Sequence, residues 1–555
     1  MRAALLHGSL VVSVLLGAMA VSYQRGYVAT PMSAALSPTP LDLDEYGGLR
    51  QAPVLSGATG IFRVEKVGKR WIFVTPAGNA LWMLGVFNIF LEQRPSDVGK
   101  GYYELILAKY GTVEKWGSQI PLRLRSWGFN VAAEYVDLRV WQKMPTIHMV
   151  NTAFNCLLNR WDLGPGPVKD LISGTDRAVY TGWRGGTTPD VFDPGFEAYV
   201  EQTMARDLSG FKRFYGSPWF VGLATDDRDW LFGFGPGDEI PARSPHPHLG
   251  WIVLVGNPQQ TANAAKGVAY ADTTVYSKRA LRDMLKAKYG TIQVLNAAWG
   301  SKYGHWDSAG GSGLLDESGR SPWVGKDFLS LKDASPVVRT DLDAYLYLYA
   351  KRYFSVMARA IRRHAGPRHL VFGPATLNSD GLTRKEILRA AGEEMDVVQA
   401  SIQSQAALEL TTRYTGGRPL VTWEGFVANP DSALFRYPQA SGSLAVPTQK
   451  MRGRLYADWV SARFQATTTS GTKPIAGIKY WEFHDNWREK GNWGLVTLSD
   501  NAYDGNEARR AAGKDAWGYA TGGEERDYGD YLSAVRSTNL AVQQALIEEL
   551  RQLKQ

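Results

Sequence analysis

A glutamate at the end of a short apolar run is the residue of this chain best placed to do chemistry. The segment Arg418–Phe426, RPLVTWEGF, has the pattern of a buried strand that ends in Trp423, Glu424 and Gly425. A carboxylate at the C-terminal tip of a parallel strand is where barrel enzymes place their reactive groups. Hydrolysis of a glycosidic bond normally needs two carboxyl groups that flank the bond. The candidate region for the second carboxyl is Val221–Trp230, VGLATDDRDW.

Three aspartates surround one arginine in this second segment. Asp226, Asp227 and Asp229 lie within four positions, with Arg228 between them. Side chains alternate between the two faces of a strand, so Asp227 and Asp229 share a face that Asp226 opposes. Close carboxylates raise one another's proton affinity, which suits a proton donor, whereas an arginine on the same face opposes that shift. We rank Asp227 first and Asp229 second as donor, with Glu239 third. The alternative is a salt-bridged cluster that organises the loop.

The segment Tyr480–Trp487, YWEFHDNW, combines aromatic and polar side chains after another apolar run. Trp481 is a candidate platform for a sugar ring, since an aromatic face provides apolar contact, although a core tryptophan has the same sequence signature. Glu482 is the rival nucleophile if Glu424 has only a structural role. His484 and Asp485 are candidate hydroxyl-binding groups, or a pair that satisfies itself within a loop. Other predicted substrate contacts are Asn88, Glu134, Arg228 and Trp423.

Short apolar runs alternate with helical stretches along the chain, which is the pattern of βα units around a parallel sheet. This predicts an α/β fold, a (β/α)8 TIM barrel with long loop insertions and a small N-terminal β extension. The eight predicted strands are Leu81–Val86, Phe129–Ala133, Thr146–Val150, Phe220–Thr225, His369–Gly373, Met395–Ser401, Pro419–Trp423 and Ile475–Trp481.

The predicted domain organisation follows from these runs. A signal peptide at 1–20 and a linker at 21–53 precede the β extension at 54–75, in which two strands join through Val67, Gly68 and Lys69. The barrel is expected at 76–515, with an insertion at about 231–335 that contains a helical stretch from Tyr276 to Gly300. A helical segment at 516–555 is expected to pack against the barrel.

The first residues predict export. Arg2, an apolar stretch at Ser9–Leu16 and the small residues Ala18 and Ala20 form the pattern of a signal peptide. No later segment has the roughly 18 to 20 apolar residues of a membrane span, so we expect a periplasmic or secreted protein without stable membrane insertion after cleavage. An uncleaved N-terminal anchor is the alternative. The lone Cys156 cannot form an internal disulfide.

The amino-acid composition indicates which kinds of ligand the protein is expected to bind. The net charge of +8 is compatible with an anionic polymer, but no Lys/Arg cluster resembles a nucleic-acid-binding tract. Nineteen tryptophans suit stacking on sugars as well as a large core. The histidines at 246 and 248 have no cysteine or carboxylate at a metal-ligand spacing, so we expect no catalytic metal and no cofactor.

Several segments in order resemble the agarase-type glycoside hydrolases of clan A, particularly family 50, with similarity to family 42 beta-galactosidases. The resemblance covers roughly residues 60 to 510. Besides the segments that contain Glu424 and Trp481, it rests on Arg70–Asn88, Arg123–Tyr135, Pro189–Val200 and Lys288–Gly300.

The resemblance implies a retaining hydrolase of a galactan such as agarose, with Glu424 as nucleophile after the seventh strand. In those families the proton donor is a glutamate after the fourth strand, in a pattern Asp-Asn-Glu that falls here on Asp226, Asp227 and Arg228. Arginine thus stands where the donor is expected. Either a neighbouring aspartate donates the proton, or the chain binds carbohydrate on a degenerate barrel without cleaving it. A third possibility is a hydrolase in which Arg228 recognises the sulfate or carboxylate of an acidic polysaccharide, because guanidinium binds oxyanions bidentately.

Overall fold

The computed structural model of the chain describes residues 40–54, 57–91, 102–151, 168, 171, 188–226, 248–255, 274–307, 313–315, 334–374, 383–402, 404–425, 446, 448–485, 493–497, 500, 513–514, 520–521 and 528–553. The predicted signal peptide, Cys156, the histidine at 246 and the candidate donors Asp227, Asp229 and Glu239 lie outside these residues, as does Arg228.

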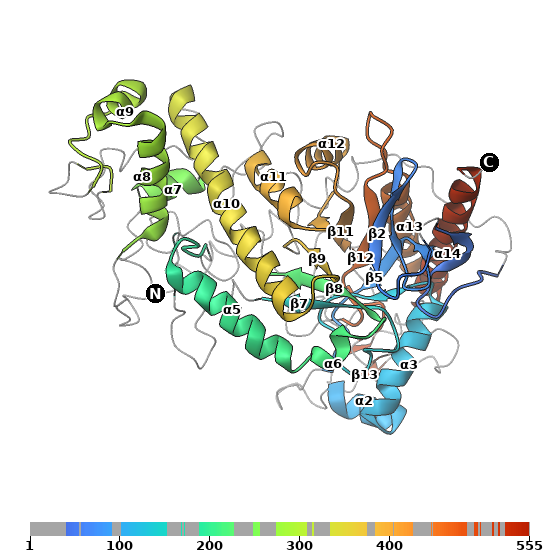
Figure 1. Cartoon of the computed structure of the whole chain (residues 1–555). Coiled ribbons are helices and arrows are strands. Elements are labelled where there is room, and N and C mark those ends of the chain that lie inside the picture. The colour runs from blue at the N-terminus through green and yellow to red at the C-terminus, as the bar shows by residue number, and fades with distance from the viewer. Residues whose placement is uncertain are drawn as a thin grey trace.

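Eight parallel strands form the centre of the molecule (Figure 1). Their order is β10-β11-β12-β5-β6-β7-β8-β9, so each strand pairs with the next along the chain and β12 returns to β5. The ring is completed where the Gly373 amide, just after β9, donates to the Val397 carbonyl before β10 at 2.9 Å. The strands are β5 Met83–Val86, β6 Val131–Ala132, β7 Thr146–Val150, β8 Phe220–Thr225, β9 Leu370–Phe372, β10 Val398–Ala400, β11 Leu420–Gly425 and β12 Ile475–Tyr480. The predicted barrel is confirmed, and each of the eight predicted runs overlaps one of its strands.

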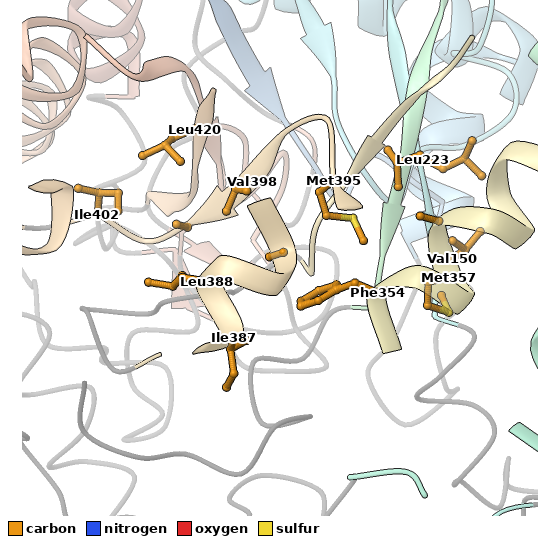
Figure 2. Close-up of a cluster of buried hydrophobic side chains, with 14 of the residues drawn as sticks. Val150, Leu223, Phe354, Met357, Ile387, Leu388, Met395, Val398, Ile402 and Leu420 are labelled. Atoms are coloured by element: carbon orange, nitrogen blue, oxygen red, sulfur yellow. The ribbon is translucent and has the colours of Figure 1, made fainter. Parts of the chain in front are cut away.

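The barrel strands are mostly apolar because both of their faces are covered. Alternate residues point into the barrel, where Ile147, Val221 and Val421 belong to one buried cluster. The intervening residues point outward against the helices. Figure 2 shows Leu223 of β8 and Val398 of β10 on this outer face, in one cluster with side chains from helices α10 and α11. Two separate cores therefore hold each strand in register.

Helices connect the strands and cover the outside of the barrel (Figure 1). Helix α5 shows how one of them begins: Asp193 caps it by accepting the Gly195 amide at 2.8 Å, and Pro194 is its first residue. The helices are α2 Tyr102–Tyr110, α3 Val113–Ser126, α5 Pro194–Ser209, α6 Lys212–Tyr215, α7 Leu249–Val255, α8 Tyr276–Tyr289, α9 Ile292–Trp299, α10 Pro336–His364, α11 Lys385–Glu394, α12 Gln405–Tyr414, α13 Gln449–Gln465 and α14 Tyr528–Gln552. None of the helices in the described ranges is long and apolar enough to cross a membrane.

Helices α7, α8 and α9 lie between β8 and β9 in the chain, within the range 231–335 predicted as an insertion, at the end of the molecule away from the strands (Figure 1). The buried Asp341 of α10 binds helices α8 and α9 to α10 through side-chain hydrogen bonds. Its carboxylate accepts the Tyr289 hydroxyl at 2.6 Å, the Trp299 indole N–H at 2.7 Å and the Lys288 ammonium at 2.5 Å. A buried carboxylate with three donors is a well-satisfied anchor.

An antiparallel sheet precedes the barrel, with strand order β1-β4-β3-β2. The strands are β1 Leu49–Pro53, β2 Arg63–Val67, β3 Arg70–Val74 and β4 Asn79–Leu81. Strands β2 and β3 are the predicted hairpin, whereas β1 lies in the range 21–53 expected to be a linker. Arg70 joins this sheet to the C-terminal helix: its guanidinium donates to Glu549 of α14 at 2.8 Å and to the Phe464 carbonyl of α13 at 3.0 Å. Two further short strands, β13 Gly513–Lys514 and β14 Ala520–Thr521, pair with each other.

Candidate active site

The C-terminal ends of the barrel strands gather most of the polar residues that the sequence singled out. Asn88 follows β5, Glu134 follows β6, Asp226 follows β8, and Trp481 follows β12. Because all eight strands are parallel, these ends open at one mouth. Glu424 lies at this same mouth, as the penultimate residue of β11.

Tight packing surrounds the backbone of Glu424. Trp423 points into the barrel, fully buried, with its ring 4.5 Å from that of Phe87. A Cβ added at Gly425 would lie 1.7 Å from the ring of Trp459 on α13. Glycine is therefore required at position 425 because the Trp459 ring occupies the space that a side chain would need. The position of Glu424 is thus fixed from the barrel interior on one side and from a helix on the other.

A buried lysine crosses the barrel just beneath the mouth. Lys479 of β12 is fully buried, and its ammonium donates to the carboxylate of Glu134 and to the side-chain oxygen of Gln399. The Gln399 amide nitrogen donates to the Gly373 carbonyl at 2.9 Å, which turns its oxygen toward the lysine. Burial lowers the pKa of Lys479, while the charge and hydrogen bond of Glu134 act in the opposite direction.

The lysine cluster also contacts the aromatic side chains of the barrel interior. The Lys479 ammonium lies 5.1 Å from the ring centroid of Trp423 and 5.0 Å from that of Phe372. Glu134, predicted as a substrate contact, is fully buried and ion-paired. The arrangement therefore makes Glu134 and Lys479 part of the floor under the mouth, where they support Trp423 and the adjoining Glu424.

Glu482 and Asn88 meet at the mouth. The Asn88 side-chain amide donates to the Glu482 carboxylate at 2.5 Å, and Glu482 is fully buried. Asn88 has a φ of 60°, a left-handed conformation that asparagine tolerates better than most residues. The Trp481 amide donates to the Gly425 carbonyl at 3.0 Å. The segment that contains Glu482 therefore lies directly beside the end of β11 that contains Glu424.

Trp481 forms an aromatic surface with Phe87. The two ring centroids are 4.5 Å apart, and Trp481 is only partly buried. Phe87 also contacts Trp423, so three rings, one in β11 and two directly after β5 and β12, lie in series at the mouth. The peptide bond between Trp481 and Glu482 is cis. The partly exposed ring is the one in this series available for an external apolar contact.

His484 and Asp485 fold the loop after β12. The Asp485 carboxylate accepts the Gly494 amide at 2.8 Å, and the His484 ring nitrogen Nδ1 lies 3.0 Å from the Asp485 carbonyl. Arg452 of α13 donates to the carbonyls of Trp493 and Gly494 at 2.9 Å each. Both His484 and Asp485 are buried, which favours a role in shaping the loop that positions Glu482.

Asp226 is the member of the aspartate segment that the structure describes. Its carboxylate accepts the Tyr353 hydroxyl of α10 at 2.6 Å, and it is fully buried with a φ of 29°. Asp226 thus faces the helix layer and is the last described residue before Asp227, Arg228 and Asp229.

Sequence reasoning missed Lys479 and Gln399. The signal was present, since a lysine interrupts the otherwise apolar run IAGIKYW. A charged residue within a fully buried strand needs a partner. That partner, Glu134, is 345 positions away in the chain, so the pattern alone did not identify it.

Comparison with known proteins relates this architecture to agarases. No family model matches the chain. It is 22% identical over 519 residues to beta-agarase B from Vibrio sp. (strain JT0107), which covers 82% of this chain and 48% of that protein. Beta-agarase A of the same strain is 22% identical over 493 residues, covering 78% and 43%. The chain spans about half the length of these curated relatives.

Solved structures agree with the sequence comparison. An exo-beta-agarase superposes with a TM-score of 0.65 at 20% identity, over 96% of this chain and 70% of that one. The agarase AgWH50C gives a TM-score of 0.64 at 17% identity, over 97% and 71%. The chain is agarase-like in sequence and in fold. The predicted resemblance to agarases is thereby confirmed, and at these identities the solved structures show that the fold is shared.

Proposed function

We propose that this agarase-like chain is a retaining glycoside hydrolase that cleaves a galactan such as agarose. The observation that carries the proposal is the position of Glu424 at the C-terminal end of the seventh barrel strand, in a fold that agarases share. Its neighbours support the role: Trp481 provides a partly exposed aromatic face beside it, and the residues around it are rigidly packed.

In this proposal Glu424 attacks the anomeric carbon and forms a covalent glycosyl-enzyme, which water then hydrolyses. A second carboxyl donates a proton to the leaving oxygen and afterwards takes a proton from the attacking water. We assign this role to Asp227, with Asp229 as the second choice, because both follow the end of β8 closely in the sequence. Trp481 stacks on the sugar, and Asn88, Trp423, His484, Asp485, Arg228 and Glu134 line or support the site.

The direct test compares Glu424→Gln with Glu482→Gln on neutral agaro-oligosaccharides. We expect Glu424→Gln to lose at least about 10³-fold in kcat, since the nucleophile is gone, with product anomers of the parent protein showing retention by NMR. Glu482→Gln should keep measurable turnover. Full activity of Glu424→Gln would refute the assignment, and loss only in Glu482→Gln would transfer the nucleophile to that residue.

The proton donor needs a separate experiment. Aryl galactosides with a good leaving group do not require protonation of the leaving oxygen. Removal of the proton donor should therefore slow the hydrolysis of oligosaccharides far more than the hydrolysis of the activated aryl galactoside. Asp227→Asn and Asp229→Asn are a matched pair for this comparison. If the parent protein binds the oligosaccharide without cleaving it, the degenerate-barrel alternative holds instead.

We also propose that the protein acts in the periplasm or outside the cell, as the sequence of the first twenty residues indicates. Expression of the full chain and fractionation with N-terminal sequencing tests this. Recovery of the uncleaved chain in the cytoplasm would contradict it.

A further inference from the structure

A cavity of about 690 Å³ lies at the opposite end of the barrel from the mouth. Residues of β3, of α11, of the end of α12 and of the turn between α12 and β11 line it. They are Trp71, Arg389, Gly392, Glu393, Arg413, Tyr414, Thr415, Gly416, Gly417 and Arg418. The turn that forms its wall leads straight into β11, so the cavity is at the N-terminal end of the strand whose C-terminal end contains Glu424. Arg418 and Glu424 are six positions apart along an extended chain, a distance of about 20 Å.

The walls of the cavity are fixed by hydrogen bonds. The Trp71 indole N–H donates to the Gly417 carbonyl at 2.9 Å, and the Arg418 Nε donates to the Gly392 carbonyl at 2.7 Å. Gly416 and Gly417 have φ values of 65° and 75°, and a Cβ at either would meet no atom within 4 Å. The turn therefore leaves open space beside the partly buried Trp71 ring.

Arginines outnumber carboxylates among the residues that line the cavity. Three arginines and one glutamate line the cavity. Glu393 is already engaged by Arg389 at 3.1 Å and by the Lys351 ammonium at 2.9 Å. In the part of the chain that the structure describes, Arg418 has no carboxylate partner within 4.0 Å, although it is partly buried.

We propose that this cavity binds an oxyanion-bearing sugar, a sulfate or carboxylate group on a galactan segment, as a second attachment point for the polymer. Guanidinium groups match such oxyanions in geometry and charge, and the partly buried Trp71 supplies an apolar ring face. Guanidinium groups beside an aromatic ring suit the binding of a charged saccharide. The cavity volume is within the range of small-ligand sites.

The inference rests on the proposed function, because a second site on a polymer-cleaving protein raises the local concentration of substrate at the mouth. Such a site acts on KM for the polymer and leaves kcat on a short oligosaccharide unchanged. The site does not include the proposed catalytic residues, so a change in polymer binding can be measured separately from a change in kcat.

The test uses the full chain and the variant Arg418→Gln, with Arg454→Gln as matched control because Arg454 is an exposed arginine on α13 that does not line the cavity. Calorimetry measures binding of a sulfated galactan oligosaccharide, a uronate-bearing oligosaccharide and a neutral one of equal length. Arg418→Gln should weaken binding of one or both charged ligands by about tenfold or more, as expected for loss of a charged hydrogen bond. Binding of the neutral ligand, and every affinity of the control, should stay unchanged.

The outcomes distinguish this site from the proposed function. If Arg418→Gln binds charged and neutral ligands as the parent does while agaro-oligosaccharides are cleaved, the second site is wrong and the hydrolase stands. If the parent binds the charged sugar through Arg418 but cleaves no galactan, the site stands and the hydrolase fails. Single-stranded DNA that competes as well as the sulfated sugar would overturn the assignment to a saccharide. Arg418→Lys, which keeps the charge, should retain part of the affinity for the charged ligand. If Arg418→Gln and Arg418→Lys lose affinity for the neutral ligand as much as for the charged one, the variants have a folding defect and the inference is overturned.

Discussion

Removing the ammonium group of Lys479 should destabilise the barrel strongly. Lys479 and Glu134 are both fully buried, and each is the other's charge partner. Lys479→Met leaves the Glu134 carboxylate without its cation, and breaking a buried ion pair from one side costs about 3 to 5 kcal/mol. The Gln399 oxygen loses its donor as well. We therefore expect a loss at the upper end of that range.

The double variant Lys479→Met/Glu134→Gln isolates the interaction free energy between Lys479 and Glu134 from their interactions with other residues. With both charges gone, no uncompensated ion remains, so the double variant should be less destabilised than the sum of the two single variants. We expect a coupling free energy of about 2 kcal/mol or more. Urea unfolding, followed by tryptophan fluorescence, measures the free energy of unfolding of all four proteins.

The exposed pair of Arg359 and Glu197, whose side chains are 49% and 38% exposed, provides the control. Arg359→Gln should cost less than about 1 kcal/mol because solvent screens the pair. A Lys479→Met variant within 1 kcal/mol of the parent, or strictly additive single variants, would refute the reasoning that this cluster supports the floor of the site.

Other expected outcomes concern separate parts of the fold. Burial acts to raise the pKa of Glu549, but Arg70 and Lys473 outweigh it and hold the pKa below its usual value. That carboxylate stabilises the fold above about pH 4.3 and loses its contribution as pH falls through the lower folded-state pKa. Glu549→Gln should therefore lower the thermal midpoint at pH 7, with a difference that shrinks under acid; a constant difference would contradict this. Gly425→Ala should cost about 1 to 3 kcal/mol by overpacking against the Trp459 ring, and adding Trp459→Leu should recover part of it in the same melting assay. Asp341→Asn should speed amide hydrogen exchange in α8 and α9 while leaving the barrel strands protected, and uniform protection would show that the carboxylate is not their anchor.

The barrel was predictable from the chain because its signal is local. Each strand is a short apolar run buried on both faces, so Thr146–Val150 and Phe220–Thr225 have the same bounds in sequence and structure. The start of α5 also depends on neighbouring residues alone, since Asp193 caps the helix and Pro194 is its first residue. The position of Glu424 at a strand end follows from the same local pattern.

The sequence by itself therefore determined the strands, their order of appearance and the chemical character of the residues at their ends. Only the tertiary structure decided which of those residues meet. Asn88 and Glu482 are 394 positions apart, and Lys479 contacts both Glu134 and Gln399 across the barrel. Such contacts depend on ring closure, which brings the first strand beside the last, and hydrophobic periodicity contains no information about partners at that distance.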